Sequence, residues 1–123
     1  MKPTASELDI LQILWQNGNM TVKDINEEIN KVKETGYTTT LKLMQIMHEK
    51  GLLSREQNGR SHVYKASIKE DDTKSSLLKY FIQSTFNGST ASLVMQALGD
   101  HKTTREELEM IRELLNDIEK GKK

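Results

Sequence analysis

The order of elements within residues 38–65 constrains the fold more than any other feature of the 123-residue chain. Residues 38–50 carry apolar and small side chains at helical spacing, and Gly51 follows where a left-handed residue commonly ends a helix. A strand comes next, and Asn58-Gly59 is a strong signal for the tight turn of a β-hairpin. The segment therefore predicts a helix followed directly by a hairpin.

Two further helices are predicted ahead of this segment. Thr4 and Glu7 have the spacing of a capping box and open a helix that ends before Gly18. Thr21 and Asp24 predict the start of a second helix in the same way. Three helices and a basic hairpin in this order are typical of a winged helix-turn-helix. In that fold the third helix fits the DNA major groove and the hairpin lies beside it.

The second half of the chain predicts only helices. Three helical segments are expected at about residues 71–86, 89–98 and 104–119, after a polar connection without periodicity. We therefore expect two domains: a winged helix-turn-helix over residues 1–68 and a three-helix dimerisation arm over residues 69–123. The predicted fold class is mainly α with a small β-hairpin.

The last predicted helix, capped by Thr103 or Thr104, carries apolar residues spaced by three, four and three positions, which is the pattern of a helix–helix seam. This seam could pack within its own chain or against a second copy. Only 35% of the residues are hydrophobic and 5% aromatic, so the core of one chain would be thin, and we expect a homodimer. The expected dimer interface comprises Phe81, Leu93, Leu108, Ile111, Leu114, Leu115 and Ile118.

Positive charge gathers in the candidate DNA-reading segment, although the formal net charge of the chain is zero. Residues 36–66 hold five Lys/Arg and two Asp/Glu, whereas residues 67–123 hold nine Lys/Arg and ten Asp/Glu. Hydroxyls, amides and cations on the outer face of the third helix can read base edges, and arginines that flank the hairpin turn can hold phosphates. A solvated helix face and a charged edge hairpin are the competing interpretation. The expected DNA contacts are Thr38, Thr39, Leu41, Lys42, Gln45, Ile46, Arg55, Arg60 and His62.

No residue pattern indicates catalysis or a bound metal. The chain has no cysteine, which excludes disulfides and cysteine-ligated zinc, and His48, His62 and His101 lack the spacing of metal ligands. No nucleophile with an acid–base partner can be named, so we expect neither an enzyme nor a cofactor. No apolar run approaches roughly 18 residues, which predicts a cytoplasmic protein without membrane insertion.

Several segments of the chain resemble the penicillinase-repressor family of bacterial winged-helix regulators. They are SELDILQILWQNG, YTTTLKLMQIMHEKGLLSRE, NGRSHVYKA, SLV and EELEMIRELLNDI, which together span nearly the whole chain. The resemblance implies a homodimeric repressor that binds a pseudo-palindromic operator and controls resistance genes. It also implies a membrane sensor metalloprotease as a partner, whose action causes cleavage in the dimerisation arm.

The chain departs from the family pattern at three places. Leu41 and Ile46 are apolar where arginine is common in the family, so we do not expect a shared operator sequence. The bond that corresponds to the family's Asn-Phe cleavage site is Gln96–Ala97, which argues against cleavage at this position. A copper-responsive branch of the family uses C-terminal cysteines, and this chain has none.

The sequence thus predicts a homodimeric, sequence-specific transcriptional repressor of resistance or stress genes. A winged-helix module that binds proteins is the alternative, and the neutral chain and the apolar Leu41 and Ile46 support it. DNA binding through several phosphates weakens steeply with salt, whereas an apolar protein contact does not. Salt dependence therefore separates the two functions.

Overall fold

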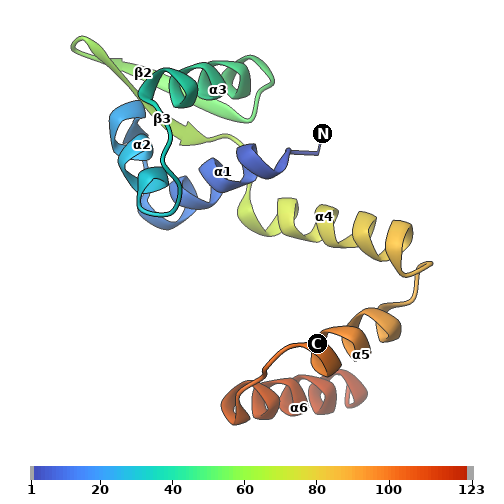
Figure 1. Ribbon diagram of the computed structural model, residues 1–123. Coiled ribbons are helices and arrows are strands. Elements are labelled where there is room, and N and C mark those ends of the chain that lie inside the picture. The colour runs from blue at the N-terminus through green and yellow to red at the C-terminus, as the bar shows by residue number, and fades with distance from the viewer. Residues whose placement is uncertain (1, 122–123) are drawn as a thin grey trace. The chain divides into compact units, whose positions relative to one another are not determined.

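The computed structural model describes residues 2–121, and within that range it contains six α-helices and three β-strands (Figure 1). This content confirms the predicted fold class, mainly α with a small sheet. The chain divides into two compact units between Leu78 and Lys79, inside helix α4. The elements are α1 (Ala5–Asn17), β1 (Met20–Thr21), α2 (Val22–Asn30), α3 (Tyr37–Glu49), β2 (Leu53–Asn58), β3 (Ser61–Ala66), α4 (Glu70–Thr85), α5 (Thr90–Asp100) and α6 (Arg105–Glu119).

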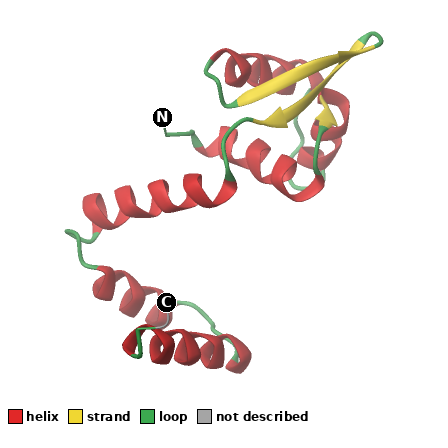
Figure 2. Cartoon of the chain, turned by 180° about the vertical axis from the view of Figure 1, so that it is seen from behind, coloured by secondary structure: helices red, strands yellow, loops and turns green. Residues whose placement is uncertain are grey.

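The three strands form an antiparallel sheet with the order β1-β3-β2. Strand β1 was not predicted, because it is only two residues long and pairs Met20 with Tyr64 and Thr21 with Val63. Thr21 therefore has two roles, since it ends β1 and caps α2. The distal part of the β2–β3 hairpin extends beyond the helices in both views (Figures 1 and 2).

One hydrophobic core joins α1, α2, α3 and the base of the hairpin. The inner face of α3 packs into this core, with Thr40, Met44 and Met47 at most 1% exposed. Burying apolar side chains from α1, α2, α3 and the hairpin is the main favourable contribution to folding of the first unit. The core consists of Ile10, Leu11, Leu14, Val22, Ile25, Met44, Met47, Leu52, Leu53 and Tyr64.

The predicted helix starts are confirmed by their hydrogen bonds. Thr4 Oγ1 accepts from the Glu7 N–H at 3.2 Å, and the Thr4 N–H donates to Glu7 Oε1 at 2.9 Å. Of the two candidates for α6, Thr104 is the N-cap, and it forms a complete capping box. At α2 only one of the two capping-box bonds is present among the described residues, from the Asp24 N–H to Thr21 Oγ1.

The three helices of the second half also begin and end close to their predicted bounds. Between α4 and α5 the chain turns through Asn87 and Gly88, whose φ angles are +52° and +82°. The rings of Phe81 and Phe86 stack edge to face near this turn, with centroids 5.6 Å apart. The boundary expected between residues 68 and 69 falls in the connection before α4, and as a domain boundary it stays a prediction.

Glu7 makes a buried ion pair that its role in a capping box did not predict. Its side chain is 2% exposed, and Glu7 Oε2 accepts from Lys50 Nζ at 2.7 Å. Burial alone raises the pKa of the Glu7 carboxyl, but hydrogen bonds from the Lys50 ammonium and the Thr4 N–H outweigh it and leave the pKa lowered. The pair ties the start of α1 to Lys50, the C-cap of α3.

The variant Glu7→Gln tests this pair. Because folding lowers the Glu7 pKa, the pair stabilises the fold fully above the pKa of the unfolded chain and loses its effect as pH falls through the folded value. We expect Glu7→Gln to lower the free energy of unfolding by about 1–2 kcal/mol at neutral pH, with a smaller difference at acidic pH, below the carboxyl pKa of the unfolded chain. Urea unfolding followed by the fluorescence of Trp15, the single tryptophan, measures the free-energy difference at neutral and at acidic pH.

Asp24→Asn is the matched control, because Asp24 occupies the same helix position in α2 but is exposed and has no ion pair in the described structure. It should leave unfolding nearly unchanged at both pH values. A pH-independent loss in Glu7→Gln would show that the carboxylate charge contributes nothing.

Candidate nucleic-acid interface

The outer face of α3 is polar and solvent-exposed. Thr38, Thr39, Lys42 and Gln45 are all exposed, on the side of the helix opposite its buried residues. Their side chains offer two hydroxyls, an ammonium and an amide over the first two and a half turns of α3. These are the groups that pair with base edges and phosphates.

The two apolar residues at the margins of this face differ in their surroundings. Leu41 is half-buried and packs against the core of the first unit. Ile46 is 39% exposed, so a substantial part of its side chain faces solvent. Ile46 therefore gives the outer face an apolar contact surface, whereas much of Leu41 supports the fold.

The N-terminus of α3 has no side-chain cap. Its N-cap is Gly36, which makes no capping bond, and its first turn contains no acidic residue. By contrast, side chains of Thr4, Thr21, Ser89 and Thr104 accept bonds at the starts of α1, α2, α5 and α6. The first N–H groups of α3 thus remain open at the positive end of the helix dipole.

The hairpin turn lies one residue later than predicted. Asn58 pairs with Ser61 as the last residue pair of the ladder, so the two-residue loop is Gly59-Arg60 rather than Asn58-Gly59. Gly59 has φ +65°, and Arg60 is not among the residues with positive φ. A turn with glycine first and an ordinary residue second has the pattern of type II′, which suits the twist of a hairpin.

The two arginines of the hairpin therefore have different positions. Arg60 lies in the turn itself, at the tip of the hairpin. Arg55 lies opposite Tyr64 within the ladder, and its Nη1 donates to Tyr64 Oη at 3.3 Å. His62 is half-buried, with its ring edge to face on Tyr64 at 6.3 Å between centroids. Only Arg60 occupies the tip, whereas the side chains of Arg55 and His62 contact Tyr64.

The cations on this surface are largely unneutralised. Within residues 2–121, Lys42, Arg60 and Lys65 have no carboxylate within ion-pair distance. Lys50, which contributes to the local positive charge, is instead engaged by Glu7. Cations without a carboxylate partner can interact with phosphates without first breaking an internal ion pair.

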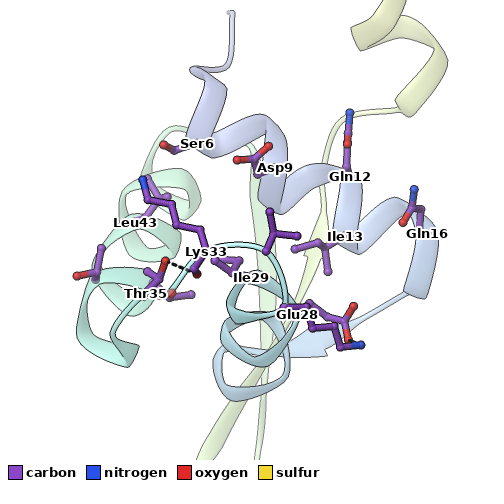
Figure 3. A pocket seen from close by; sticks show the side chains of 14 residues that line it. Ser6, Asp9, Gln12, Ile13, Gln16, Glu28, Ile29, Lys33, Thr35 and Leu43 are labelled. Carbon is purple, nitrogen blue, oxygen red and sulfur yellow. Dashed lines mark hydrogen bonds and ion pairs between the residues drawn. The ribbon is translucent and has the colours of Figure 1, made fainter.

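A cavity of about 480 Å³ lies next to the start of α3 (Figure 3). Ile13, Ile29 and Leu43 line it with apolar groups from α1, α2 and α3, and Asp9 and Lys33 contribute charged groups. In the described part of the chain, no group of three or more His, Cys, Asp or Glu residues could hold a metal ion. Residues of the connection between α2 and α3 also line the cavity, and hydrogen bonds from α2 hold this connection in place.

Sequence reasoning missed the residues that hold this connection, Asn26 and Asn30 of α2. Both donate side-chain hydrogen bonds to the carbonyl of Thr35, at 3.0 and 2.9 Å. Asn30 Nδ2 also donates to the Asn26 carbonyl at 2.7 Å within α2, but the partners outside α2 lie five to fourteen positions away along the chain. No local pattern in the sequence marks these two asparagines.

Comparisons with solved structures agree with this architecture. The chain is similar to the solution structure of the DNA-binding domain of the repressor BlaI, with a TM-score of 0.51 and 24% identity over 58% of this chain and 93% of that domain. It is also similar to a MarR family protein from Bacillus stearothermophilus, with a TM-score of 0.56 and 16% identity over 98% of this chain and 76% of that one. The first unit therefore has a winged helix-turn-helix fold.

Sequence comparisons identify the family. The family model described as penicillinase repressor matches residues 3–117. The chain is 30% identical to the penicillinase repressor of Staphylococcus aureus over 94% of this chain and 91% of that protein. It is 26% identical to the methicillin resistance regulatory protein MecI of S. aureus strain N315 over 92% of each. The chain belongs to the penicillinase-repressor family. None of the helices described over residues 2–121 is long and apolar enough to cross a membrane.

The position of the hairpin turn generates a prediction. Gly59→Ala should lower the free energy of unfolding by about 1 kcal/mol, because an alanine at φ +65° is strained. Asn58→Ala should change it by less than about 0.5 kcal/mol, because Asn58 has ordinary strand geometry. Urea unfolding of both variants checks this, and a larger loss in Asn58→Ala would place the turn at Asn58-Gly59.

Proposed function

We propose that this protein is a homodimeric transcriptional repressor that binds a pseudo-palindromic operator and controls resistance or stress genes. Family membership supports the general function, and the observation that carries it to particular residues is the exposed polar face of α3 beside its uncapped N-terminus. Two half-site contacts on one duplex reinforce each other, so a dimer can bind specifically even if each half-site is weak.

The proposed recognition surface is the outer face of α3. Thr38 and Thr39 lie in the first turn, where a hydroxyl and the open N–H groups can hold one phosphate. Lys42 and Gln45 lie one and two turns further, where they can reach base edges in the major groove. Ile46 can contact a thymine methyl, and Leu41 contributes at the margin. The apolar pair therefore favours an operator different from one read by arginine.

The proposed backbone contacts come from the hairpin. Arg60, at the tip, is placed to reach a phosphate or the minor groove beside the helix. Arg55 lies in the middle of the ladder and His62 one pair from its last pair, and both contact Tyr64. Their contacts with Tyr64 restrict their side chains, which lowers the entropy lost when they bind a phosphate.

A second copy of the chain is the proposed partner of α5 and α6. Both helices lie entirely within the described range, and none of their residues is buried. Leu114, Leu115 and Ile118 are each about half exposed on α6. Apolar side chains in this number favour burial against a partner. The proposed interface is the seven-residue set Phe81, Leu93, Leu108, Ile111, Leu114, Leu115 and Ile118.

Cleavage in the dimerisation arm would require α5 to open. The Gln96–Ala97 bond lies inside α5, where the Gln96 side chain also bonds to Asp100. A protease must engage the opened backbone, so a membrane sensor metalloprotease could act here only after local unfolding of α5.

A protein-binding winged helix is the second candidate function. The exposed Ile46 and the zero formal net charge favour it. Binding of DNA should weaken with salt at a log–log slope of about −0.9 per neutralised phosphate, whereas an apolar protein contact should respond little. Binding to the chain's own upstream promoter across a salt series, with a scrambled duplex as competitor, tests the proposed function.

The variants Lys42→Ala and Arg60→Ala test the assigned surface. Each should weaken operator binding, and each phosphate contact that is lost should reduce the salt slope by about 1. Gel shifts across a salt series measure both quantities. Lys102→Ala is the matched control, because Lys102 is an exposed lysine of the second unit without an ion pair in the described structure. Wild-type affinity in both test variants would show that α3 and the hairpin do not contact DNA.

The dimer interface is tested by placing a charge on α6. Leu115→Glu should shift the protein from dimer to monomer, because it buries a carboxylate in an apolar interface. Asn116→Glu introduces the same group about 100° around the helix from Leu115, outside the apolar seam, and should leave the dimer intact. Sedimentation equilibrium gives the mass in each case. Dimers of equal stability in both variants would place the interface elsewhere.

A further inference from the structure

Two asparagines of α2, Asn26 and Asn30, form what we call the asparagine clamp. Asn26 Nδ2 donates to Thr40 Oγ1 at 2.8 Å and to the Thr35 carbonyl at 3.0 Å. Asn30 Nδ2 donates to the same carbonyl at 2.9 Å, and Asn30 Oδ1 accepts from the Thr35 N–H at 3.0 Å. The clamp thus binds both the connection that leads into α3 and a side chain of α3 itself.

The bond to Thr40 fixes how α3 is turned about its own axis. Thr40 is 1% exposed, and a buried hydroxyl that loses its hydrogen-bond partner destabilises the fold. Successive residues of an α-helix are about 100° apart around the axis, so a rotation of α3 would carry the Thr40 hydroxyl away from Asn26. The same rotation would misdirect Thr39 and Lys42, which lie on the exposed outer face of the same helix.

The clamp also fixes the position of the start of α3, which lacks an N-terminal cap. The start of α3 has no capping side chain of its own, and residues of the connection before it line a cavity. The clamp holds Thr35 and Thr40, on either side of the first helical turn, and leaves the N–H groups of that turn open. A side-chain cap would instead occupy one of those N–H groups.

We propose that Asn26 and Asn30 are positioning residues for operator recognition, acting through Thr35 and Thr40 to set the orientation of α3. This inference rests on the proposed function. Hydrogen bonds to base edges depend on the direction of each side chain, whereas phosphate attraction is sequence-independent. The clamp should therefore control the ratio of operator affinity to non-specific affinity, more than overall affinity.

The test uses Thr40, because it is buried and cannot touch DNA itself. Thr40→Val removes the hydroxyl at nearly constant volume, and Thr40→Ser keeps it. Thr40→Val should lower the ratio of affinities for the promoter operator and a scrambled duplex on the order of fivefold to tenfold. Thr40→Ser should retain a ratio near that of wild type. The double variant Asn26→Ala with Thr40→Val should lose less than the sum of the two single losses.

Amide hydrogen exchange at Tyr37–Thr40 in the DNA-free protein measures how well the clamp holds the start of α3, independently of DNA binding. Exchange there should be faster in Thr40→Val and Asn26→Ala than in wild type. Asn17→Ala is the control, since Asn17 Nδ2 makes a bond of the same kind but to its own helix, to the Ile13 carbonyl at 2.9 Å. It should change neither the exchange at α3 nor the affinity ratio.

Three outcomes distinguish the possible failures. Equal losses of affinity for both duplexes in Thr40→Val would show a structural role only and overturn the inference. Faster exchange with an unchanged affinity ratio would also overturn it. No preference of the wild-type protein for any promoter duplex would overturn the proposed function, and the positioning role with it.

Discussion

The burial of one face of α3 is the constraint on which the rest of the first unit depends. Thr40, Met44 and Met47 are at most 1% exposed, so this side of the helix is fixed against α1, α2 and the hairpin base. A helix can present a defined surface to a partner only if its opposite side is held. The ion pair between Glu7 and Lys50 holds the end of the helix, while the asparagine clamp holds its beginning.

Placement of charge, and not its total, makes this surface suitable for DNA. The chain has a formal net charge of zero, yet Lys42 and Arg60 project from α3 and the hairpin tip without carboxylate partners among the described residues. Lys50 contributes to the local charge in the sequence, but Glu7 neutralises it in the structure. Counting charged residues along a segment therefore overestimates the positive charge that is available to a ligand. The uncapped start of α3 partly compensates, because its open N–H groups are positive.

The second unit differs from the first in how it satisfies its apolar residues. In the first unit ten hydrophobic side chains form a buried core, whereas no residue of α5 or α6, both fully described, is buried. Helices of this kind are stable mainly through packing of an apolar face, since propensity alone supports a helix of this length only marginally. The proposed dimer would supply that packing. Operator binding and the stability of the second unit would then depend on the same association.

The sequence by itself determined the features whose signals are local. Capping residues such as Thr4 and Thr104, the glycine at Gly51 with φ +86° and the helical spacing of apolar residues all act within a few positions of one another. The hairpin was predicted for the same reason, although the choice of Gly59-Arg60 over Asn58-Gly59 depended on strand pairing. Pairing register is fixed by side chains across the whole ladder, which a dipeptide signal cannot report.

Only the tertiary structure decided the contacts between residues far apart in the chain. The pairing of β1 with β3, the ion pair from Glu7 to Lys50 and the bond from Asn26 to Thr40 join positions 14 to 44 residues apart. Glutamate and asparagine are common on the exposed faces of helices, so the residue type alone does not reveal that Glu7 or Asn26 has a distant partner. Partners become defined only when core burial brings α1, α2 and α3 together. The sequence therefore determined the outer face of α3, which we propose reads DNA, and the tertiary structure decided how that helix is held.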